Sequence, residues 1–174
     1  MVNQQPLLAM QHIAKGFPGV QALKEVEFTV YPGEIVGFLG ENGAGKSTLI
    51  KILSGIHLKD SGTIHFNGQE VSPHSPQEAQ KLGISTIHQE LALIPYLSVA
   101  ENIFLNREPR LALGRVDFRR MNREAEAILH DLGAEIPGKK LVYELNVAAQ
   151  QIVEIAKAVS QNAQLILMDE PTSA

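Results

Sequence analysis

The chain has 174 residues, 44% of them apolar, which is enough for one substantial core. Its net charge is −4, and we expect the lysines and arginines to be dispersed along the chain. No basic stripe of the kind that binds nucleic acid is therefore expected, and nucleic acid is not an expected partner. The lack of cysteine excludes disulfides and thiolate metal sites, and no apolar run approaches the roughly 20 residues of a membrane-spanning helix.

The first thirty residues predict an antiparallel sheet. Apolar and polar residues alternate loosely over 7–13 and cleanly over 26–30, as in strands with one buried face. Between them, residues 15–20 predict a turn that carries an aromatic side chain, Phe17. Two interpretations of Phe17 remain open, because it can offer a stacking surface to a purine ring or pack under the turn.

Residues 34–53 carry the strongest motif. An apolar run at 35–39 predicts a strand, and the residues from 49 to 53 predict a helix. Between them lies the loop Gly40-Glu41-Asn42-Gly43-Ala44-Gly45-Lys46-Ser47-Thr48. Strand, glycine-rich loop and helix in this order are typical of a phosphate-binding loop, in which backbone N–H groups and the helix N-terminus surround the phosphates.

The polar side chains of this loop fit nucleotide chemistry. Lys46 supplies a mobile cation for the outer phosphates, Ser47 can bind a bridging magnesium ion, and Thr48 can donate to the inner phosphate. GTPases are disfavoured because no Asn-Lys-x-Asp motif occurs. Small-molecule kinases share such a loop and are disfavoured only by the segments that follow Leu145.

The next segment predicts a hairpin at 63–71 around Asn67-Gly68, a short helix opened by Ser75 and stopped by Gly83, and a strand at 84–87 that leads to Gln89. Residues 90–144 predict a helical insertion. A capping box at Ser98 opens one helix, and Asp117 caps another. The predicted apolar face of the second helix consists of Phe118, Met121, Ala125, Ile128, Leu129 and Leu132.

The last thirty residues predict a helix capped by Asn146 and a buried strand at 165–168 that ends in two acids. The predicted apolar stripe of the helix is Ala148, Ile152, Ile155, Ala156 and Val159. Asp169 can hold magnesium through water, and Glu170 can polarise the attacking water as a general base. The amide of Gln89 can reach both the metal and the water, so these residues are expected to converge on Lys46 and Ser47.

In its order of motifs the whole chain resembles the nucleotide-binding domain of ATP-binding cassette (ABC) transporters. Four sequence segments are similar to the ATPase subunits of bacterial monosaccharide importers of the ribose, galactose and xylose type. These segments are the loop at 40–49, Phe17-Pro18-Gly19-Val20-Gln21-Ala22-Leu23, Ser98-Val99-Ala100-Glu101-Asn102-Ile103 and Val153-Glu154-Ile155-Ala156-Lys157-Ala158.

The resemblance implies a P-loop NTPase of α/β class, with a RecA-like core, an N-terminal antiparallel β subdomain and a helical insertion. The expected division is 1–89 and 145–174 for the ATP-binding core and 90–144 for the helical subdomain. The resemblance further implies ATP and Mg²⁺ as cofactors, adenine stacked on Phe17, and Gln89 coupling catalysis to transmembrane permease subunits. A second nucleotide-binding domain, an indirect periplasmic sugar-binding protein and a peripheral place on the cytoplasmic face of the inner membrane are implied as well.

Two departures from the family pattern stand out. Where the family carries a signature resembling Leu-Ser-Gly-Gly-Gln, this chain has Leu145-Asn146-Val147-Ala148-Ala149, in which Asn146 can still cap the helix and offer an amide to a γ-phosphate. The chain also ends at Ala174, before the family's next aspartate loop and switch histidine, so the C-terminal part of the core is expected to be missing.

The function expected from these residues is ATP hydrolysis that energises a monosaccharide importer. Two alternatives stay open. One is the ATPase of an ABC system with a non-sugar substrate, and the other is a truncated, non-catalytic remnant that binds nucleotide weakly.

Overall fold

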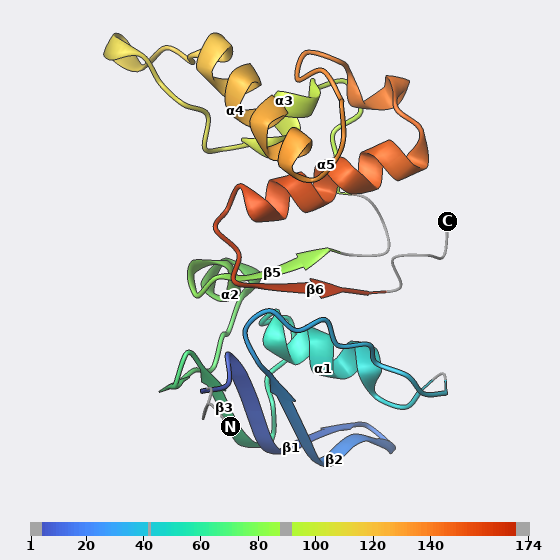
Figure 1. Ribbon diagram of the computed structural model, residues 1–174. Coiled ribbons are helices and arrows are strands. Elements are labelled where there is room, and N and C mark those ends of the chain that lie inside the picture. The colour runs from blue at the N-terminus through green and yellow to red at the C-terminus, as the bar shows by residue number, and fades with distance from the viewer. Residues whose placement is uncertain (1–4, 42, 88–91, 170–174) are drawn as a thin grey trace. The chain divides into compact units, whose positions relative to one another are not determined.

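The computed structural model describes residues 5–41, 43–87 and 92–169 (Figure 1). Contacts between Cα atoms divide the chain into two compact units, Met1–Leu82 and Gly83–Ala174. Each unit is described by itself below, and they are called the first and the second unit.

The first unit contains a four-stranded antiparallel sheet with strand order β2-β1-β3-β4. Strands β1 (Leu8–Phe17) and β2 (Val20–Val30) form a hairpin, β3 (Ser61–Phe66) pairs with the other edge of β1, and β4 (Gln69–Glu70) pairs with β3. The predicted antiparallel sheet is confirmed. The predicted turn at 15–20 shrinks to Pro18 and Gly19, since Phe17 still pairs with Val20.

Two helices complete the first unit. Helix α1 (Lys46–Leu53) follows the glycine-rich loop and contacts β2, and α2 (Pro76–Lys81) begins at the capping residue Ser75, as predicted. The core combines one face of the sheet with one face of α1. Its buried residues are Leu8, Met10, Ile13, Leu23, Val30, Ile64 and Phe66 from the sheet and Leu49, Ile50, Ile52 and Leu53 from the helix.

The strand predicted at 35–39 is not formed. Residues 34–40 form neither a helix nor a strand and pair with no described strand, and Ile35 and Leu39 are fully exposed. Within the apolar run, Phe38 makes an aromatic contact with Phe28 of β2 at 4.6 Å between ring centroids. The prediction was wrong here because an apolar run becomes a strand only where a neighbour supplies backbone hydrogen bonds.

The second unit contains a two-stranded parallel sheet under three helices. Strands β5 (Ile84–Ile87) and β6 (Leu165–Met168) pair in register from Ile84 with Leu165 to Ile87 with Met168. Both strands were predicted. They are separated by 77 residues in sequence, a far longer connection than a single crossover helix requires, and this agrees with an insertion in an α/β layout.

The helices of this unit are α3 (Val99–Ile103), α4 (Phe118–Asp131) and α5 (Val147–Val159), with short 3₁₀ turns at Ala112–Gly114 and Val142–Glu144. They pack on one another around a common core. That core consists of Val99, Ala100, Ile103, Phe104, Met121, Ala125, Leu129, Val142, Val153 and Ala156. None of the helices within the described ranges is long and apolar enough to cross a bilayer.

The predicted helix faces need correction. Phe118 is 56% exposed although it was placed on the apolar face of α4, and the buried face begins at Met121. In α5 the predicted stripe included Ala148 and Val159, which are both exposed, while Val153 is buried. The error has one physical source, since the outermost turns of a helix extend past the core that its middle covers.

Candidate functional site

The glycine-rich loop surrounds the ammonium group of its own lysine. Lys46 is the first residue of α1, and its Nζ donates to the carbonyl oxygens of Gly40 at 2.5 Å and Glu41 at 2.8 Å. The N–H of Ala44 closes a turn on the Glu41 carbonyl at 3.2 Å. The lysine thus lies over the concave side of the loop, where a phosphate chain would replace carbonyl oxygens with anionic ones. Asn42 of the motif lies outside the described residues.

Two glycines of the loop have left-handed backbones, with φ of 86° at Gly43 and 87° at Gly45. A Cβ at Gly43 would meet nothing within 4 Å, but one at Gly45 would lie 2.6 Å from both the carbonyl oxygen of Ala22 and Cδ2 of Leu23. Gly45 is therefore required on two grounds, conformation and space, because α1 begins directly against β2.

The N-terminus of α1 is open to an anion. Gly45, the residue before the helix, provides no side-chain cap, and the first turn contains no acidic residue. The leading N–H groups of a helix have no intrahelical partner and carry a partial positive charge. With Lys46 and the loop backbone beside them, they form the positive cradle that phosphate-binding loops use.

Phe17 lies at the end of β1 and remains accessible. Its side chain is 38% exposed, it meets the ring of His57 edge to face at 5.3 Å, and Lys15 Nζ lies 5.6 Å from its ring centroid. The structure therefore supports Phe17 on two sides while leaving part of the ring exposed. No sequence signal pointed to His57 as its neighbour.

An ion pair fixes the strand end that carries Phe17. Asp60 accepts from Lys15 Nζ at 2.6 Å and from the backbone N–H of Gly16 at 2.7 Å. The hydrogen bond from Lys15, followed by that from Gly16, holds the pKa of the Asp60 carboxyl below its ordinary value. The carboxylate thereby ties the tip of the β1–β2 hairpin to the turn before β3.

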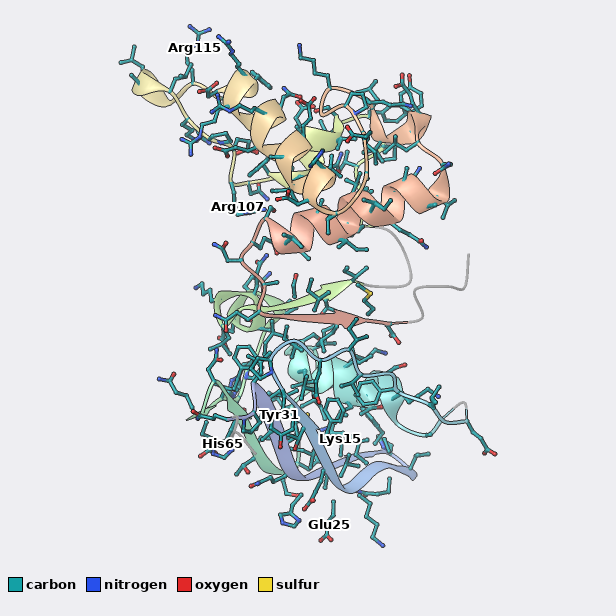
Figure 2. All side chains as sticks on the ribbon, viewed as in Figure 1. Lys15, Glu25, Tyr31, His65, Arg107 and Arg115 are labelled. Carbon is teal, nitrogen blue, oxygen red and sulfur yellow. The ribbon has the colours of Figure 1, made fainter. Side chains whose placement is uncertain are left out.

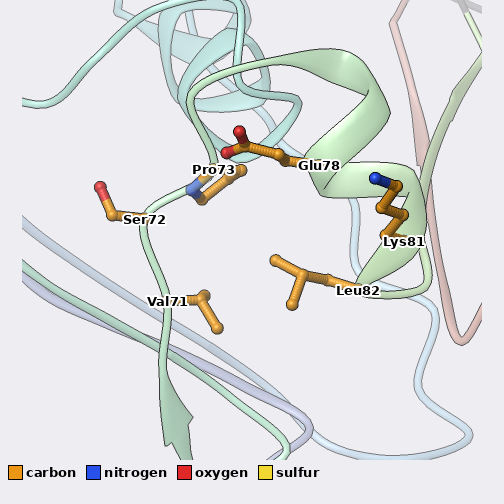
Figure 3. A pocket seen from close by; sticks show the side chains of 6 residues that line it. All are labelled: Val71, Ser72, Pro73, Glu78, Lys81 and Leu82. Carbon is orange, nitrogen blue, oxygen red and sulfur yellow. The ribbon is translucent and has the colours of Figure 1, made fainter.

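A shallow pocket of about 340 Å³ lies elsewhere in the first unit (Figure 3). Its lining residues are Val71, Ser72, Pro73, Glu78, Lys81 and Leu82. Ser75, at the start of α2, packs against Gly55 just beyond the C-terminal end of α1. The phosphate loop lies at the opposite end of that helix, so this pocket contributes nothing to the loop.

The predicted acids follow the parallel strands of the second unit. Asp169 comes directly after β6, and its backbone N–H donates to the carbonyl of Ile87, the last residue of β5, at 3.1 Å. Because the strands are parallel, their carboxyl ends share one edge of the sheet, which is where α/β proteins place functional side chains. Gln89 and Glu170 follow these strands in sequence but lie outside the described residues.

The oxygen donors of the motif suit magnesium. Mg²⁺ in nucleotide enzymes is usually held by one or two protein oxygens together with phosphate oxygens and water. The Ser47 hydroxyl in the first turn of α1 and the Asp169 carboxylate after β6 are donors of this class. Within the described ranges no group of three or more His, Cys, Asp or Glu side chains could hold a metal.

The signature-like segment begins α5. Asn146 Oδ1 accepts from the N–H of Ala149 at 2.8 Å, so the predicted cap is confirmed. Val147 and Ala148 are exposed, and Ala149 is partly buried. The segment can present backbone and the Asn146 Nδ2 group to a ligand, but the amide oxygen of Asn146 is already used within the helix.

Sequence reasoning missed the residue that organises the loop before α3. Asn102 is completely buried, and its amide bonds four backbone groups. Its Oδ1 accepts from Ile94 N–H at 2.7 Å, while its Nδ2 lies 3.1 Å from the Ile94 carbonyl, 3.4 Å from that of Leu97 and 3.0 Å from that of Ser98. The available sequence signal was the position of Asn102, a polar residue on the buried side of the short helix that begins at Ser98.

A ladder of backbone hydrogen bonds joins residues 95–100 to residues 138–143. Its donor and acceptor pairs are Val99 to Lys140 (2.9 Å), Ala100 to Gly138 (2.9 Å), Val142 to Leu97 (3.1 Å) and Tyr143 to Pro95 (3.0 Å). The side chain of Gln150 extends it into α5 by donating to the Leu145 carbonyl at 3.0 Å. The chain that follows Gln89 in sequence is thus tied to the chain that leads into Asn146.

Comparison with known proteins agrees with this description. The chain is 48% identical over 170 residues to the ribose import ATP-binding protein RbsA of Caldanaerobacter subterraneus subsp. tengcongensis, covering 98% of this chain and 34% of that protein. It is 51% identical over 167 residues to ribose import ATP-binding protein RbsA 2 of Streptomyces coelicolor, covering 96% of this chain and 32% of that protein. The chain thus spans about a third of the length of these relatives.

Solved structures with the same fold include the ADP conformation of MJ1267, an ATP-binding cassette of an ABC transporter. It is 26% identical, superposes with a TM-score of 0.83, and matches 98% of this chain and 70% of its own. A nucleotide-free ATP-binding cassette from an ABC transporter, also 26% identical, gives a TM-score of 0.80. Finally, the family model for ABC transporters matches residues 23–173, and the chain belongs to this family.

Proposed function

We propose that this chain is the ATP-binding part of a subunit that hydrolyses ATP to energise monosaccharide import. The observation that carries the proposal is the loop, in which Lys46 lies on the carbonyls of Gly40 and Glu41 beside the open N-terminus of α1. The relatives are ribose import ATP-binding proteins, which supports a sugar as the cargo.

The loop would bind the phosphates of ATP. Lys46 would exchange its two carbonyl partners for oxygens of the outer phosphates, and the N–H groups of Gly43 and Gly45 would donate to the chain of phosphates. Thr48 donates to the inner phosphate. Phe17 stacks on adenine, since part of its ring is exposed and its other contacts hold it in place.

Ser47, Gln89 and Asp169 are the proposed magnesium ligands, the last through water. Bound magnesium would offset the negative charge that develops on the transferred phosphoryl group. Glu170 orients the attacking water and takes its proton, which makes it the general base. Gln89 would in addition couple catalysis to the permease through the helical insertion, in which the ladder ties residues 95–100 to residues 138–143.

The proposed partners are transmembrane permease subunits, a second nucleotide-binding domain and, indirectly, a periplasmic sugar-binding protein. The segment Asn146 to Ala149 would approach the ATP of the second domain, offering the Nδ2 group of Asn146 and the exposed start of α5. These partners place the protein on the cytoplasmic face of the membrane.

Lys46→Ala tests the site directly. Charge-assisted hydrogen bonds contribute roughly 1.5–3 kcal/mol each, so Mg-ATP affinity measured by titration calorimetry on the full-length protein should fall about 10- to 100-fold. Lys51→Ala is the matched control, because this exposed lysine lies in the last turn of the same helix and should leave affinity unchanged. Equal affinity of the wild type and the Lys46 variant would refute the assignment.

Glu170→Gln tests the base. The variant should bind Mg-ATP as the wild type does and lose nearly all turnover, since general bases contribute roughly 10²- to 10⁴-fold. Phosphate release and nucleotide affinity are measured on the same preparation. Loss of both together would contradict the base role, and binding without turnover in the wild type would favour the non-catalytic alternative.

The cargo needs a separate test. Cells that lack the gene should lose uptake of radiolabelled ribose or a related monosaccharide, and the wild-type gene but not its Lys46→Ala form should restore it. Unchanged uptake of every monosaccharide tried would refute sugar as the cargo while leaving the ATP site intact.

A further inference from the structure

All arginines of the chain lie in one short stretch. The six are Arg107, Arg110, Arg115, Arg119, Arg120 and Arg123, and the other nine of the 15 Lys and Arg residues are lysines. We call residues 107–123, which connect α3 to the first turns of α4, the basic arm. The expectation of dispersed basic residues therefore holds only for lysine. With two acids against six arginines the arm carries +4, and the rest of the chain carries −8.

The base of the arm is held rigidly within the second unit. Arg107 donates to the Ser160 carbonyl at 3.0 Å and to the Ile103 carbonyl at 2.8 Å (Figure 2 labels Arg107 and Arg115). Above it, Leu111 N–H donates to the Arg115 carbonyl at 2.7 Å, and Arg110 pairs with Val116 in a β-bridge. The arm is a small hairpin of defined shape.

The end of the arm presents apolar side chains to solvent. Leu113 is completely exposed, Leu111 is 52% exposed, and Phe118 follows at the start of α4 with 56%. Leu113 also has φ 67° and ψ 17°, a left-handed backbone that leucine rarely adopts. A strained residue that buries nothing in its own fold indicates a function outside that fold.

Three arginines beside these apolar groups are available for binding. Arg115, Arg119 and Arg123 are exposed, and no hydrogen bond or ion pair joins their side chains to any other part of the described chain. By contrast, Arg120 is paired with Glu124 at 2.6 Å. Arg119 and Arg123 are four residues apart on α4, so they share one side of the helix and repel each other unless an anion lies between them.

We propose that the basic arm docks on an anionic phospholipid surface, with Leu111 and Leu113 entering the headgroup region and Arg115, Arg119 and Arg123 binding lipid phosphates. Guanidinium groups bind phosphate in a bidentate way that lysine does not match, which gives the use of arginine in this stretch a chemical reason. Exposed leucines surrounded by arginines fit the boundary between headgroups and acyl chains. A nucleic acid fits less well, because aliphatic side chains offer bases no aromatic surface for stacking.

This contact goes beyond the proposed function, since it requires neither ATP nor a permease. It would orient the second unit at the membrane independently of protein partners. Attraction of basic residues to an anionic leaflet is reversible and sensitive to salt, so the arm would assist assembly and would not anchor the protein alone.

The test is sedimentation of the full-length protein with vesicles, in the absence of nucleotide. We expect at least tenfold more binding to vesicles of phosphatidylcholine and phosphatidylglycerol than to phosphatidylcholine alone, with loss of binding between about 50 mM and about 500 mM salt as screening increases. Arg115→Glu, Arg119→Glu and Arg123→Glu together should abolish it.

Two controls separate docking from charge and from misfolding. The triple change Lys24→Glu, Lys139→Glu and Lys140→Glu alters net charge equally at other exposed positions and should leave most binding intact. Leu113→Asn, which tolerates the left-handed backbone, should reduce binding several-fold without lowering Tm. Equal loss in both triple variants, equal binding to both vesicle types, or binding to single-stranded DNA or polyglutamate but not to vesicles would each overturn the proposal.

Discussion

Helices α1 and α5 both have N-termini that the proposed function directs toward phosphate, yet these termini are built in opposite ways. Helix α1 follows Gly45 and has no side-chain cap. Helix α5 follows Asn146, whose amide oxygen accepts from Ala149 N–H. Of the α-helices in the described ranges, α1 alone lacks such a cap, since α2, α3 and α4 are capped by Ser75, Ser98 and Asp117.

The difference shows how a helix end is reserved for a ligand. A cap stabilises a helix by satisfying its leading N–H groups, and this removes them from binding. At α1 the stabilisation is given up, and glycine lets the loop turn so tightly that the N–H groups and Lys46 share one cradle. At α5 the cap is retained, so binding there must use the other amide atom of Asn146 and exposed backbone.

Gly45→Ala should give the largest effect. The left-handed backbone and the 2.6 Å approach to Ala22 and Leu23 together should cost about 3–5 kcal/mol of stability around α1, and Mg-ATP binding should be lost. Hydrogen exchange of peptides from α1 and β2 measures the stability. Gly43→Ala is the matched control, with nearly the same φ but open space, and should cost only about 1–2 kcal/mol.

Asn102→Ala tests the second unit, which contains α5. Removing the buried amide leaves the Ile94 N–H without its acceptor and removes the donations of Asn102 Nδ2 to the Ile94, Leu97 and Ser98 carbonyls, so stability around α3 should fall by about 2–4 kcal/mol. Hydrogen exchange of residues 92–104 should rise, with Mg-ATP affinity unchanged. Asn122→Ala is the control, because the amide of Asn122 donates only within its own helix, to the Phe118 carbonyl at 2.6 Å, and its buried Oδ1 has no partner in the described chain. A similar loss in both variants would contradict the special role of Asn102.

Asn146→Ala should give the smallest effect. Loss of an N-cap costs typically about 1 kcal/mol, so fraying should be confined to the first turn of α5 and the affinity of the phosphate loop should not change. Asn146→Ser should restore stability, since a serine hydroxyl caps equally well. A large fall in the Mg-ATP affinity of the isolated subunit on Asn146→Ala would break the comparison, because it would make the α5 terminus part of the same site as α1.

The sequence predicted most elements of this fold because their signals are local. Ser75, Ser98, Asp117 and Asn146 each begin a helix where predicted, and Asn67-Gly68 closes the predicted hairpin. The strand at 35–39 was wrong, because apolar residues specify a strand only together with a partner. Phe118 was wrong because helical periodicity does not say where the neighbouring core ends.

Within the candidate site, the residues of one motif were predictable and their neighbours were not. Lys46 and the loop glycines follow from spacing alone, since the loop builds its own geometry. The contact of His57 with Phe17 and the anchoring of Gly16 by Asp60 join residues about 40 apart in sequence. Such pairs depend on strand register and long-range packing, and a single sequence does not record them.

The unpaired apolar segment at 35–39 has a practical consequence for handling the protein. No backbone hydrogen bond joins residues 35–39 to another described residue, and Ile35 and Leu39 lie open to solvent. A segment of this kind is prone to aggregation, because a second copy can pair with it as a neighbouring strand and bury the same side chains. The protein should therefore be purified at low concentration, with nucleotide present to occupy the adjoining loop. These conditions limit aggregation through this segment.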